Sequence, residues 1–267
     1  MNANHYKYIT LETSNQITTV TLNRANKKNA MSFELIRELI KAAKQIKADK
    51  SVRAVILTGS GDDFCAGIDL GSLNDPKNRP FAMWELIKPY QNMFQKVNLC
   101  WRELPVPVIA SIYGHCIGAG LQLAMGCDVR ISSPNGKFSI MEAKWGLVPD
   151  MGLTQSAFGA VNVDVLKELA MTARVIEAKD AKEVGLITHV DEAPLEKAIL
   201  LAEELKTRSP DAVLASKRVV NLMFKQPAMT LYQEKIWQMK LMLGKNQKLA
   251  VKKAKDSAVE FVKRQFN

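Results

Sequence analysis

The sequence is poor in residues that several common kinds of catalysis require. It contains three histidines among 267 residues, which leaves little imidazole for acid, base or metal chemistry. The motifs of zinc proteases (HExxH) and of serine hydrolases (GxSxG) are absent. The four cysteines form no CxxC pair and lie within apolar segments, which predicts buried free thiols rather than disulfides or a zinc site: Cys65, Cys100, Cys116 and Cys127.

Long apolar runs are also missing. No stretch of eighteen or more residues is apolar and free of charge, so the sequence predicts no transmembrane helix. The initial sequence MNANHYKYITLETSNQ lacks the basic and then apolar layout of a signal peptide. We therefore expect no membrane partner and a cytoplasmic location, with the mature form of an organelle enzyme as the alternative.

The composition is that of a globular chain with a sizeable core. Hydrophobic residues make up 47% and charged residues 24% of the sequence, which excludes a disordered, collagen-like or small disulfide-rich protein. The formal net charge is +10, and residues 202–267 contain 14 basic and 6 acidic residues. This basic tail is compatible with a solvated helix face, a phosphate-bearing ligand or nucleic acid.

Strand and helix patterns alternate along most of the chain. Residues 6–22 are typical of a β-hairpin turned at Ser14-Asn15, and Ser32 is placed to cap a helix that runs to about Ala48. Apolar runs at 54–59 and 106–112 are typical of buried strands, so an α/β fold is expected. Four helical segments are expected after about Leu195.

Two segments are candidates for contact with a ligand. Residues 71–80 are polar and rich in turn formers, which predicts an exposed, mobile loop, and residues 71–90 are expected to shape a pocket. The glycine-rich segment 114–121 lies between a strand and a helix. It is neither a P-loop, because Leu121 and Gln122 follow Gly120, nor a dinucleotide fingerprint, because residue 123 is leucine.

The glycine-rich segment and residues 54–70 share one layout. Each runs from a buried strand through small residues to the start of a helix, where backbone N–H groups are free. Two such starts that face each other would form an oxyanion hole for a thioester carbonyl. Close packing of a helix on a strand explains the same pattern, so the segments alone leave both interpretations open.

Four segments together resemble the crotonase superfamily of enoyl-CoA hydratases and isomerases: residues 23–31, 64–70, 114–128 and 138–152. Their order and spacing match over almost the whole chain. The resemblance implies an α/β crotonase-like ββα spiral core over residues 1–200 and a C-terminal helical trimerisation region over residues 201–267. It also implies a homotrimer or a hexamer, an acyl-coenzyme A thioester as the substrate, and no metal ion or further cofactor.

The resemblance assigns roles to individual residues. The oxyanion-hole N–H groups fall on Ile68 and Ala119, and the acid and base positions of the family fall on Gln122, Glu142 and Asp150. In relatives, the positions of Phe261 and Arg264 contact the nucleotide of a neighbouring subunit's coenzyme A, although helix packing would explain Phe261 equally well. The remaining positions that line the substrate path are Ala30, Ala66, Gly67, Asp69, Leu70, Gly118 and Met141.

The residue types at the acid and base positions favour isomerisation over hydration. Hydratases carry two carboxylates, whereas Gln122 replaces one of them here, and an amide neither accepts nor gives a proton. Glu142 and Asp150 match the pattern of the dienoyl-CoA isomerases. We predict that double bonds of an enoyl- or dienoyl-CoA are shifted through a dienolate. By analogy with that family, Asp150 is expected to take the proton at carbon 2, and Glu142 is expected to give a proton to a carbon further along the acyl chain.

The other interpretations keep part of this picture. Hydration through Glu142 alone and other crotonase-type lyase or hydrolase reactions use the same oxyanion hole. Without the resemblance, Asp150 would be a helix cap and Glu142 a surface residue. A non-catalytic protein that binds RNA or acyl-CoA is a further alternative, but no RNP-like aromatic motif accompanies the basic tail, so a nucleic-acid partner is not expected.

Overall fold

The computed structural model describes residues 6–223, 227, 229–262 and 265. Arg264, predicted to contact a nucleotide, lies outside these residues. A sheet with the strand order β1-β2-β3-β4-β6-β9 forms the centre of the fold, and all its pairs except β1–β2 are parallel. The strands are β1 (Ile9–Ser14), β2 (Ile17–Leu22), β3 (Ala54–Gly59), β4 (Val108–Ile112), β6 (Val129–Ser132) and β9 (His189–Val190).

A second, smaller sheet gives the fold its spiral form. It has the order β5-β7-β8, with strands His115–Ile117, Lys137–Ser139 and Ile176–Glu177. Strand β4 is followed by β5 and then by helix α5 (Ala119–Met125), and β6 is followed by β7 and the 3-10 helix η3 (Glu142–Trp145). The chain therefore passes repeatedly from the large sheet to the small sheet and then to a helix, which confirms the predicted α/β spiral class.

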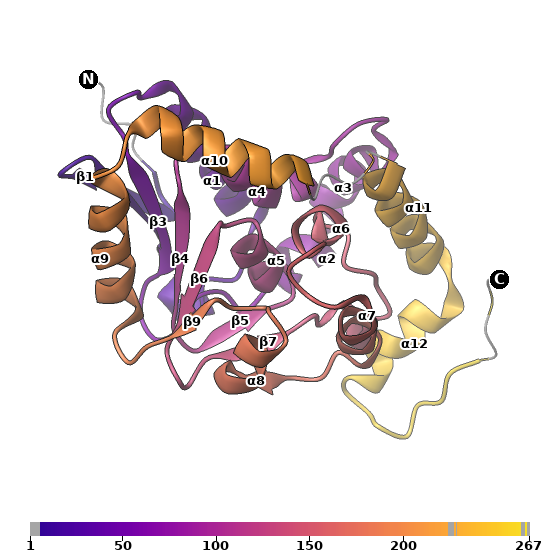
Figure 1. The fold of residues 1–267 in the computed structure, drawn as a ribbon. Helices are drawn as coiled ribbons and strands as arrows, with labels where there is room; N and C mark the ends of the chain where they lie inside the picture. The colour runs from indigo at the N-terminus through magenta and orange to yellow at the C-terminus, as the bar shows by residue number, and fades with distance from the viewer. Residues whose placement is uncertain (1–5, 224–226, 228, 263–264, 266–267) are drawn as a thin grey trace.

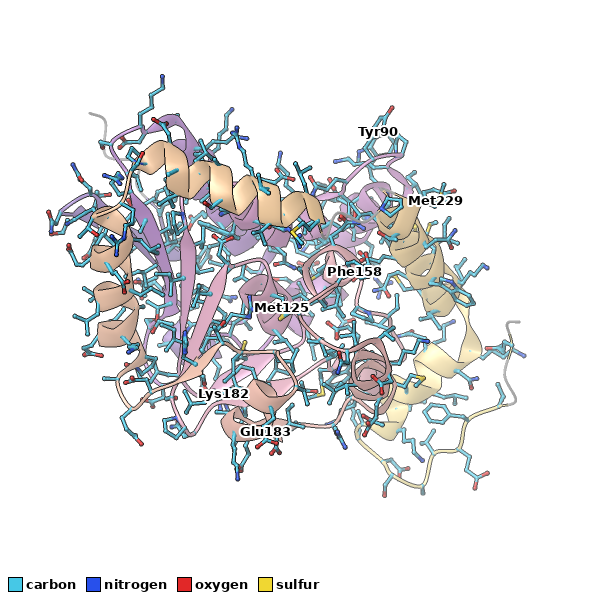
Figure 2. The ribbon with its side chains drawn as sticks, viewed as in Figure 1. Tyr90, Met125, Phe158, Lys182, Glu183 and Met229 are labelled. Atoms are coloured by element: carbon cyan, nitrogen blue, oxygen red, sulfur yellow. The ribbon has the colours of Figure 1, made fainter. Side chains whose placement is uncertain are left out.

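Helices cover both faces of the large sheet (Figure 1). Helix α9 (Pro194–Lys206) covers one face. Its buried Ala198 and Ala202 pack there in one cluster with Ile56 of β3 and Ile109 of β4. The main core lies on the other face, among α1 (Phe33–Ala48), α4 (Met93–Arg102) and α5. Figure 2 shows Met125, the last residue of α5, inside the molecule, whereas Tyr90 projects from its surface.

Local sequence signals account for the first elements. The Ser32 side chain accepts a hydrogen bond from the Leu35 N–H and caps α1, which ends at Ala48 as predicted. The hairpin turn lies one residue later than predicted, because Asn15 and Gln16 take the positive φ angles that a two-residue hairpin requires.

Residues 71–80 do not form the loop that their composition suggests. They belong to three short helical elements: α2 (Leu70–Asn74), η2 (Pro76–Asn78) and α3 (Arg79–Ile87). Asp69 and Asp75 cap the first two through their carboxylates, and proline occupies early positions of η2 and α3. Aspartate and proline favour helix starts as much as turns, which is why the prediction of a mobile loop was wrong.

Helices make up most of the chain after η3, with strands β8 and β9 between them, and the four helices expected after about Leu195 are present. After η3 come α6 (Leu153–Ser156), α7 (Val163–Thr172) and α8 (Ala178–Glu183), and the four late helices are α9, α10 (Pro210–Met223), α11 (Met229–Leu243) and α12 (Lys245–Lys253). The predicted boundary between the spiral core and the C-terminal helical region, at residue 200, lies within α9. Helix α10 runs beside α4, and α11 and α12 lie on the side away from α9 (Figure 1). No described helix is long and apolar enough to cross a membrane.

Candidate active site

Two backbone turns come together at the end of the main core. The Cys65 N–H donates to the His115 carbonyl at 2.8 Å, and the Ile117 N–H donates to the Cys65 carbonyl at 3.0 Å. These bonds form an isolated bridge between Cys65 and Cys116, each a buried free thiol as predicted. A Cβ on Gly120 would lie 2.4 Å from the Cys65 carbonyl oxygen, so only glycine allows the turns to approach this closely.

The N–H groups of Ile68 and Ala119 follow these two turns. Ile68 forms an isolated parallel bridge with Met31. The Met31 N–H donates to the Gly67 carbonyl and the Asp69 N–H donates to the Met31 carbonyl, so the N–H of Ile68 itself points away from Met31. Ala119 is the first residue of α5, where N–H groups have no partner within the helix. Within the described part of the chain, neither N–H donates a hydrogen bond, and the two turns bring them to one site.

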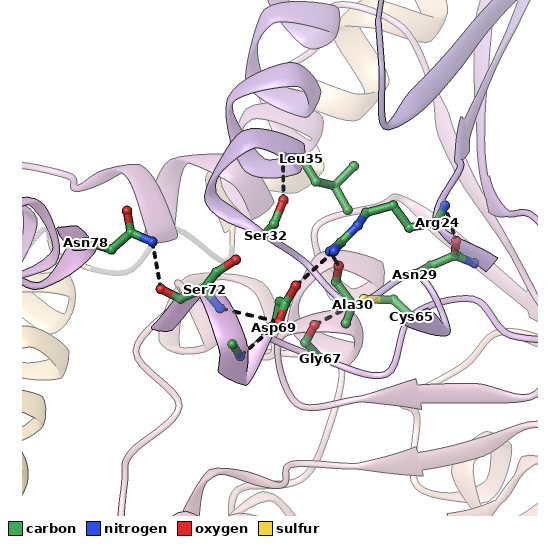
Figure 3. A network of polar contacts seen from close by, with 11 residues as sticks. Arg24, Asn29, Ala30, Ser32, Leu35, Cys65, Gly67, Asp69, Ser72 and Asn78 are labelled. Carbon is green, nitrogen blue, oxygen red and sulfur yellow. Dashed lines mark hydrogen bonds and ion pairs between the residues drawn. The ribbon is translucent and has the colours of Figure 1, made fainter. Parts of the chain in front are cut away.

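A polar network supports the turn that carries Ile68 (Figure 3). Arg24 forms an ion pair with Asp69 at 2.9 Å and donates a hydrogen bond to the Ala30 carbonyl. The Asp69 carboxylate also accepts the Gly71 N–H at 2.9 Å. Burial alone would raise the pKa of Asp69, but the hydrogen bonds from Arg24, Ser72 and Gly71 outweigh it and lower that pKa. Asp69 and Ala30 thus build the turn and do not line the cavity beside it.

An apolar cavity of about 300 Å³ lies against the two turns. Nine of the predicted site residues line it: Ala66, Gly67, Ile68, Leu70, Gly118, Ala119, Met141, Glu142 and Asp150. Leu73, Ala82 and Leu86, from the segment 71–90 expected to shape the pocket, form part of its walls, and Phe94 of α4 forms another part. The aromatic and sulfur-containing side chains expected to do so, Phe81, Met83 and Trp84, do not line the cavity, and Met83 and Trp84 are exposed.

Glu142 presents a carboxyl group to the cavity beside the turn that carries Ala119. A Cβ built on Gly118 would lie 3.4 Å from Glu142 Oε1, so this oxygen is next to the residue that precedes Ala119. Glu142 Oε2 is buried and has no hydrogen-bond partner among the described residues. Burial raises the pKa of Glu142 to about 7, against a smaller lowering by hydrogen bonds from its own backbone and from Gln122.

Asp150 provides the second carboxyl group that lines the cavity. The residue is 9% exposed. Burial, the nearby charge of Glu234 and the charge of Glu142 raise the pKa of Asp150 well above its ordinary value. Four apolar residues line the same cavity: Met141, Trp145, Leu147 and Met151. The two carboxyl groups therefore titrate as an interacting pair in an apolar environment.

Gln122 lies behind the two carboxyl groups and does not line the cavity. Its Nε2 donates to Glu142 Oε1 at 2.7 Å, and its Oε1 accepts the Met151 N–H at 3.0 Å. One amide thus connects Glu142 to the residue that follows Asp150. The predicted catalytic role of Gln122 stays a prediction; in the structure its amide is occupied by these two hydrogen bonds.

Three polar residues that hold the segment around Asp150 were not predicted from the sequence. Asn98 on α4 donates from Nδ2 to the Met151 carbonyl at 2.8 Å. On α11, Glu234 accepts the Gly152 N–H at 3.0 Å, and Gln238 accepts the Val148 N–H at 3.1 Å. The separation of Glu234 and Gln238 by four residues, which puts them on one helix face, was the only available signal.

Phe261 lies outside the cavity. Its ring is 53% exposed, and the Lys253 Nζ is 5.7 Å from the ring centroid. A contact between Phe261 or Arg264 and a neighbouring subunit's coenzyme A stays a prediction.

The geometry by itself defines a class of site. Two free N–H groups face an apolar cavity with two carboxyl groups of raised pKa, which suits stabilisation of an enolate oxygen and transfer of protons to carbon. The chain matches the enoyl-CoA hydratase/isomerase family over residues 12–267, and it belongs to this family.

Individual relatives agree with that assignment. The chain is 37% identical to human mitochondrial methylglutaconyl-CoA hydratase over 219 residues, which cover 79% of this chain and 63% of the relative. It is also 37% identical to human mitochondrial Delta(3,5)-Delta(2,4)-dienoyl-CoA isomerase over 218 residues, covering 77% and 65%. The matched region is thus less than two thirds of either protein.

A solved structure shares the fold over nearly the full length. The enoyl-CoA hydratase/isomerase from Pseudoalteromonas atlantica T6c aligns with a TM-score of 0.84 and 25% identity, covering 96% of this chain and all of that one. The enoyl-CoA hydratase from Bacillus anthracis aligns with a TM-score of 0.75 and 28% identity, covering 96% and 99%.

Proposed function

We propose that the protein shifts carbon–carbon double bonds of an enoyl- or dienoyl-CoA thioester. The observation that carries this proposal is the pair of carboxyl groups, Glu142 and Asp150, on one apolar cavity with the free N–H groups of Ile68 and Ala119. The relatives include a dienoyl-CoA isomerase. The position that would supply the second carboxylate of a hydratase is Gln122, which is occupied in holding Glu142 and Met151.

The reaction needs two proton transfers and no exchange of other atoms. For a 3,5-diene, a carboxylate takes the proton at carbon 2, and the electron pair moves to the thioester oxygen. The N–H groups of Ile68 and Ala119 would stabilise that oxygen in a cavity where little water competes. A protonated carboxyl group then gives its proton to carbon 6, which leaves the 2,4-diene.

We assign the two carboxyl groups in the opposite order to the one expected by analogy. Glu142 Oε1 lies beside Gly118, next to the N–H of Ala119 that would hold the thioester oxygen, so Glu142 is the group nearer carbon 2. The pKa of Glu142 is about 7, which leaves a substantial ionised fraction at neutral pH. Asp150 feels both burial and the charge of Glu142, which favours its protonated form. Glu142 is therefore the base and Asp150 the acid.

A panel of thioesters tests the proposed function. The purified protein is incubated with 3,5-dienoyl-, 3-enoyl- and 2-enoyl-CoA, and the products are separated and identified by mass. We expect a double-bond shift, with no gain of mass, to be the fastest reaction. A faster gain of one water on a 2-enoyl-CoA would instead support hydration, the activity in the name of the hydratase relative.

The pH dependence of kcat/KM follows from the two carboxyl groups. The base Glu142 acts when ionised, so activity should rise with pH up to its pKa of about 7. The acid Asp150 acts when protonated, so activity should fall again once the pH passes its raised pKa. We expect a bell-shaped profile whose acidic limb has a midpoint near 7. A profile that is flat from pH 5 to 8 would contradict the assignment of Glu142 as the base.

We also propose that the protein forms a homo-oligomer through α10. No residue of this helix is buried within the chain, and four apolar residues on it are exposed by half or more: Val219, Val220, Leu222 and Met223. Charge substitution at Leu222 and Met223 should lower the sedimenting mass to that of one chain. An unchanged mass would place the contact elsewhere, and a wild-type protein that sediments as one chain would contradict the oligomer itself.

A further inference from the structure

The segment that carries Asp150 has few backbone hydrogen bonds of its own and is held by side chains from three helices. Between Val148 and Gly152, three backbone N–H groups and one carbonyl bond to side chains. Those side chains are Gln238 and Glu234 of α11, Gln122 of α5 and Asn98 of α4. The position of Asp150 in the cavity therefore depends on these helices and on α11 in particular.

Glu234 also holds the residues that follow this stretch. Its Oε1 accepts the Thr154 N–H at 3.1 Å and the Thr154 hydroxyl at 2.6 Å, and its Oε2 accepts the Gly152 N–H at 3.0 Å. Gln95 Nε2 donates to Oε2 at 3.1 Å. All four groups can donate, and two of them are backbone N–H groups that can only donate, so the arrangement suits a carboxylate.

Such a buried carboxylate is costly unless its contacts serve the fold or the site. Glu234 is 4% exposed, and burial raises its pKa while the hydrogen bonds from Thr154, Gln95 and Gly152 oppose that shift. A buried glutamine or leucine would avoid the cost of a charge. Three of the four donors to Glu234 belong to Gly152 and Thr154, in the turn directly after Asp150, which links this cost to the active site.

We propose that Glu234 is a positioning residue of the active site, which holds the Gly152–Thr154 turn through its carboxylate and thereby fixes the Asp150 carboxyl group at the cavity. This inference rests on the proposed function, because it assumes that Asp150 transfers a proton. It makes α11 part of the catalytic apparatus, although this helix lies about eighty residues after Asp150 in the sequence.

The charge of Glu234 has a second consequence for Asp150. The charged and titratable groups that act on Asp150 are Glu234 from α11 and Glu142 from η3. Lys235, the neighbour of Glu234, is directed to the carbonyls of Lys88 and Tyr90, away from the Asp150 turn. Removal of the Glu234 charge should therefore make Asp150 easier to ionise, in addition to loosening the turn.

The substitution Glu234→Gln tests both consequences in the full-length protein. It replaces Oε2 by an amino group that would face the Gly152 N–H and Gln95 Nε2, donor against donor. We expect kcat to fall about 10- to 100-fold, since a misplacement near 1 Å has such an effect, with little change in KM. The basic limb of the pH profile should move to lower pH, because the charge of Glu234 helps to raise the pKa of Asp150.

A matched control is available on α3. Glu85 is also a buried carboxylate, 2% exposed, that accepts a backbone N–H, that of Met93, but it does not contact the Asp150 turn. Glu85→Gln should lower thermal stability without moving the basic limb. If Glu234→Gln likewise changes only the melting temperature, with wild-type kcat, KM and pH profile per folded molecule, the proposal is overturned.

Two further measurements keep the proposal testable if Glu234→Gln does not fold or the wild type is inactive. Thr154→Val removes one donor and leaves the charge, so kcat should fall while the basic limb stays in place; a wild-type kcat would overturn the proposal. With aspartate labelled by 13C, the Asp150 carboxyl signal, assigned by its loss in Asp150→Asn, should titrate at lower pH in Glu234→Gln. An unchanged midpoint there contradicts the inference, whereas wild-type inactivity on every thioester contradicts only the proposed function.

Discussion

Glu142→Ala is expected to lower turnover by about 10²–10⁴-fold, the range that general acid–base catalysis contributes. The substitution removes the carboxyl group that lies beside Gly118, and Gln122, the residue bonded to it, has an amide that cannot act as a base in its place. Binding of the coenzyme A thioester should change little, because the cavity is mainly apolar and its N–H donors are backbone groups. Steady-state kinetics and calorimetric titration with a non-reacting thioester measure the two effects separately.

The control for Glu142→Ala is Glu12→Ala on the edge strand β1, where the side chain is exposed. It should leave kcat and thioester affinity at their wild-type values. Unchanged turnover in Glu142→Ala would remove Glu142 from the mechanism. A large loss of affinity with unchanged kcat would make it a binding residue only.

Asp150→Asn is expected to separate the two proton transfers. Asparagine keeps the shape of the side chain but gives no proton at working pH, so the net double-bond shift should fall about 10²–10⁴-fold. Glu142 remains free to take the proton at carbon 2 and return it. In deuterated water the variant should therefore still exchange hydrogen at carbon 2 of the substrate, which mass spectrometry or NMR detects.

The two variants together decide which carboxyl group is the base. Glu142→Ala should lose both the double-bond shift and the exchange at carbon 2, whereas Asp150→Asn should lose only the shift. The reverse pattern would restore the assignment made by analogy, with Asp150 at carbon 2. Asp164→Asn, an exposed aspartate in the first turn of α7, serves as the control and should retain both reactions.

The stretches that sequence analysis located well are those in which neighbouring residues determine the structure. The cap at Ser32, the buried strand β3 and the four late helices depend on local hydrogen bonds and on hydrophobic periodicity, and both are readable from short segments. Residues 71–80 were misjudged because Asp69 and Asp75 serve equally in turns and as helix caps. Whether a turn or a helix forms there depends on which residues pack against the segment.

The candidate site divides in the same way. The motifs around Gly67, Gly118, Glu142 and Asp150 identified most of the cavity, since each motif is short and its backbone conformation is local. Glu234 and Gln238 carry no motif and lie about ninety residues from the groups that they hold. A hydrogen bond between such distant positions exists only once α11 has packed beside the 148–154 segment.

The amino-acid sequence alone therefore determined the α/β class, the free thiols, the family resemblance and the residue types that make proton transfer by two carboxyl groups the predicted chemistry. Tertiary structure decided that the Glu142 carboxyl group lies beside Gly118, that the Gln122 amide bonds to it, and that Glu234 holds the turn after Asp150. The physical reason is that acidity and orientation depend on burial and on charges brought close in space. For Glu142, this raises the pKa from 4.5 to about 7.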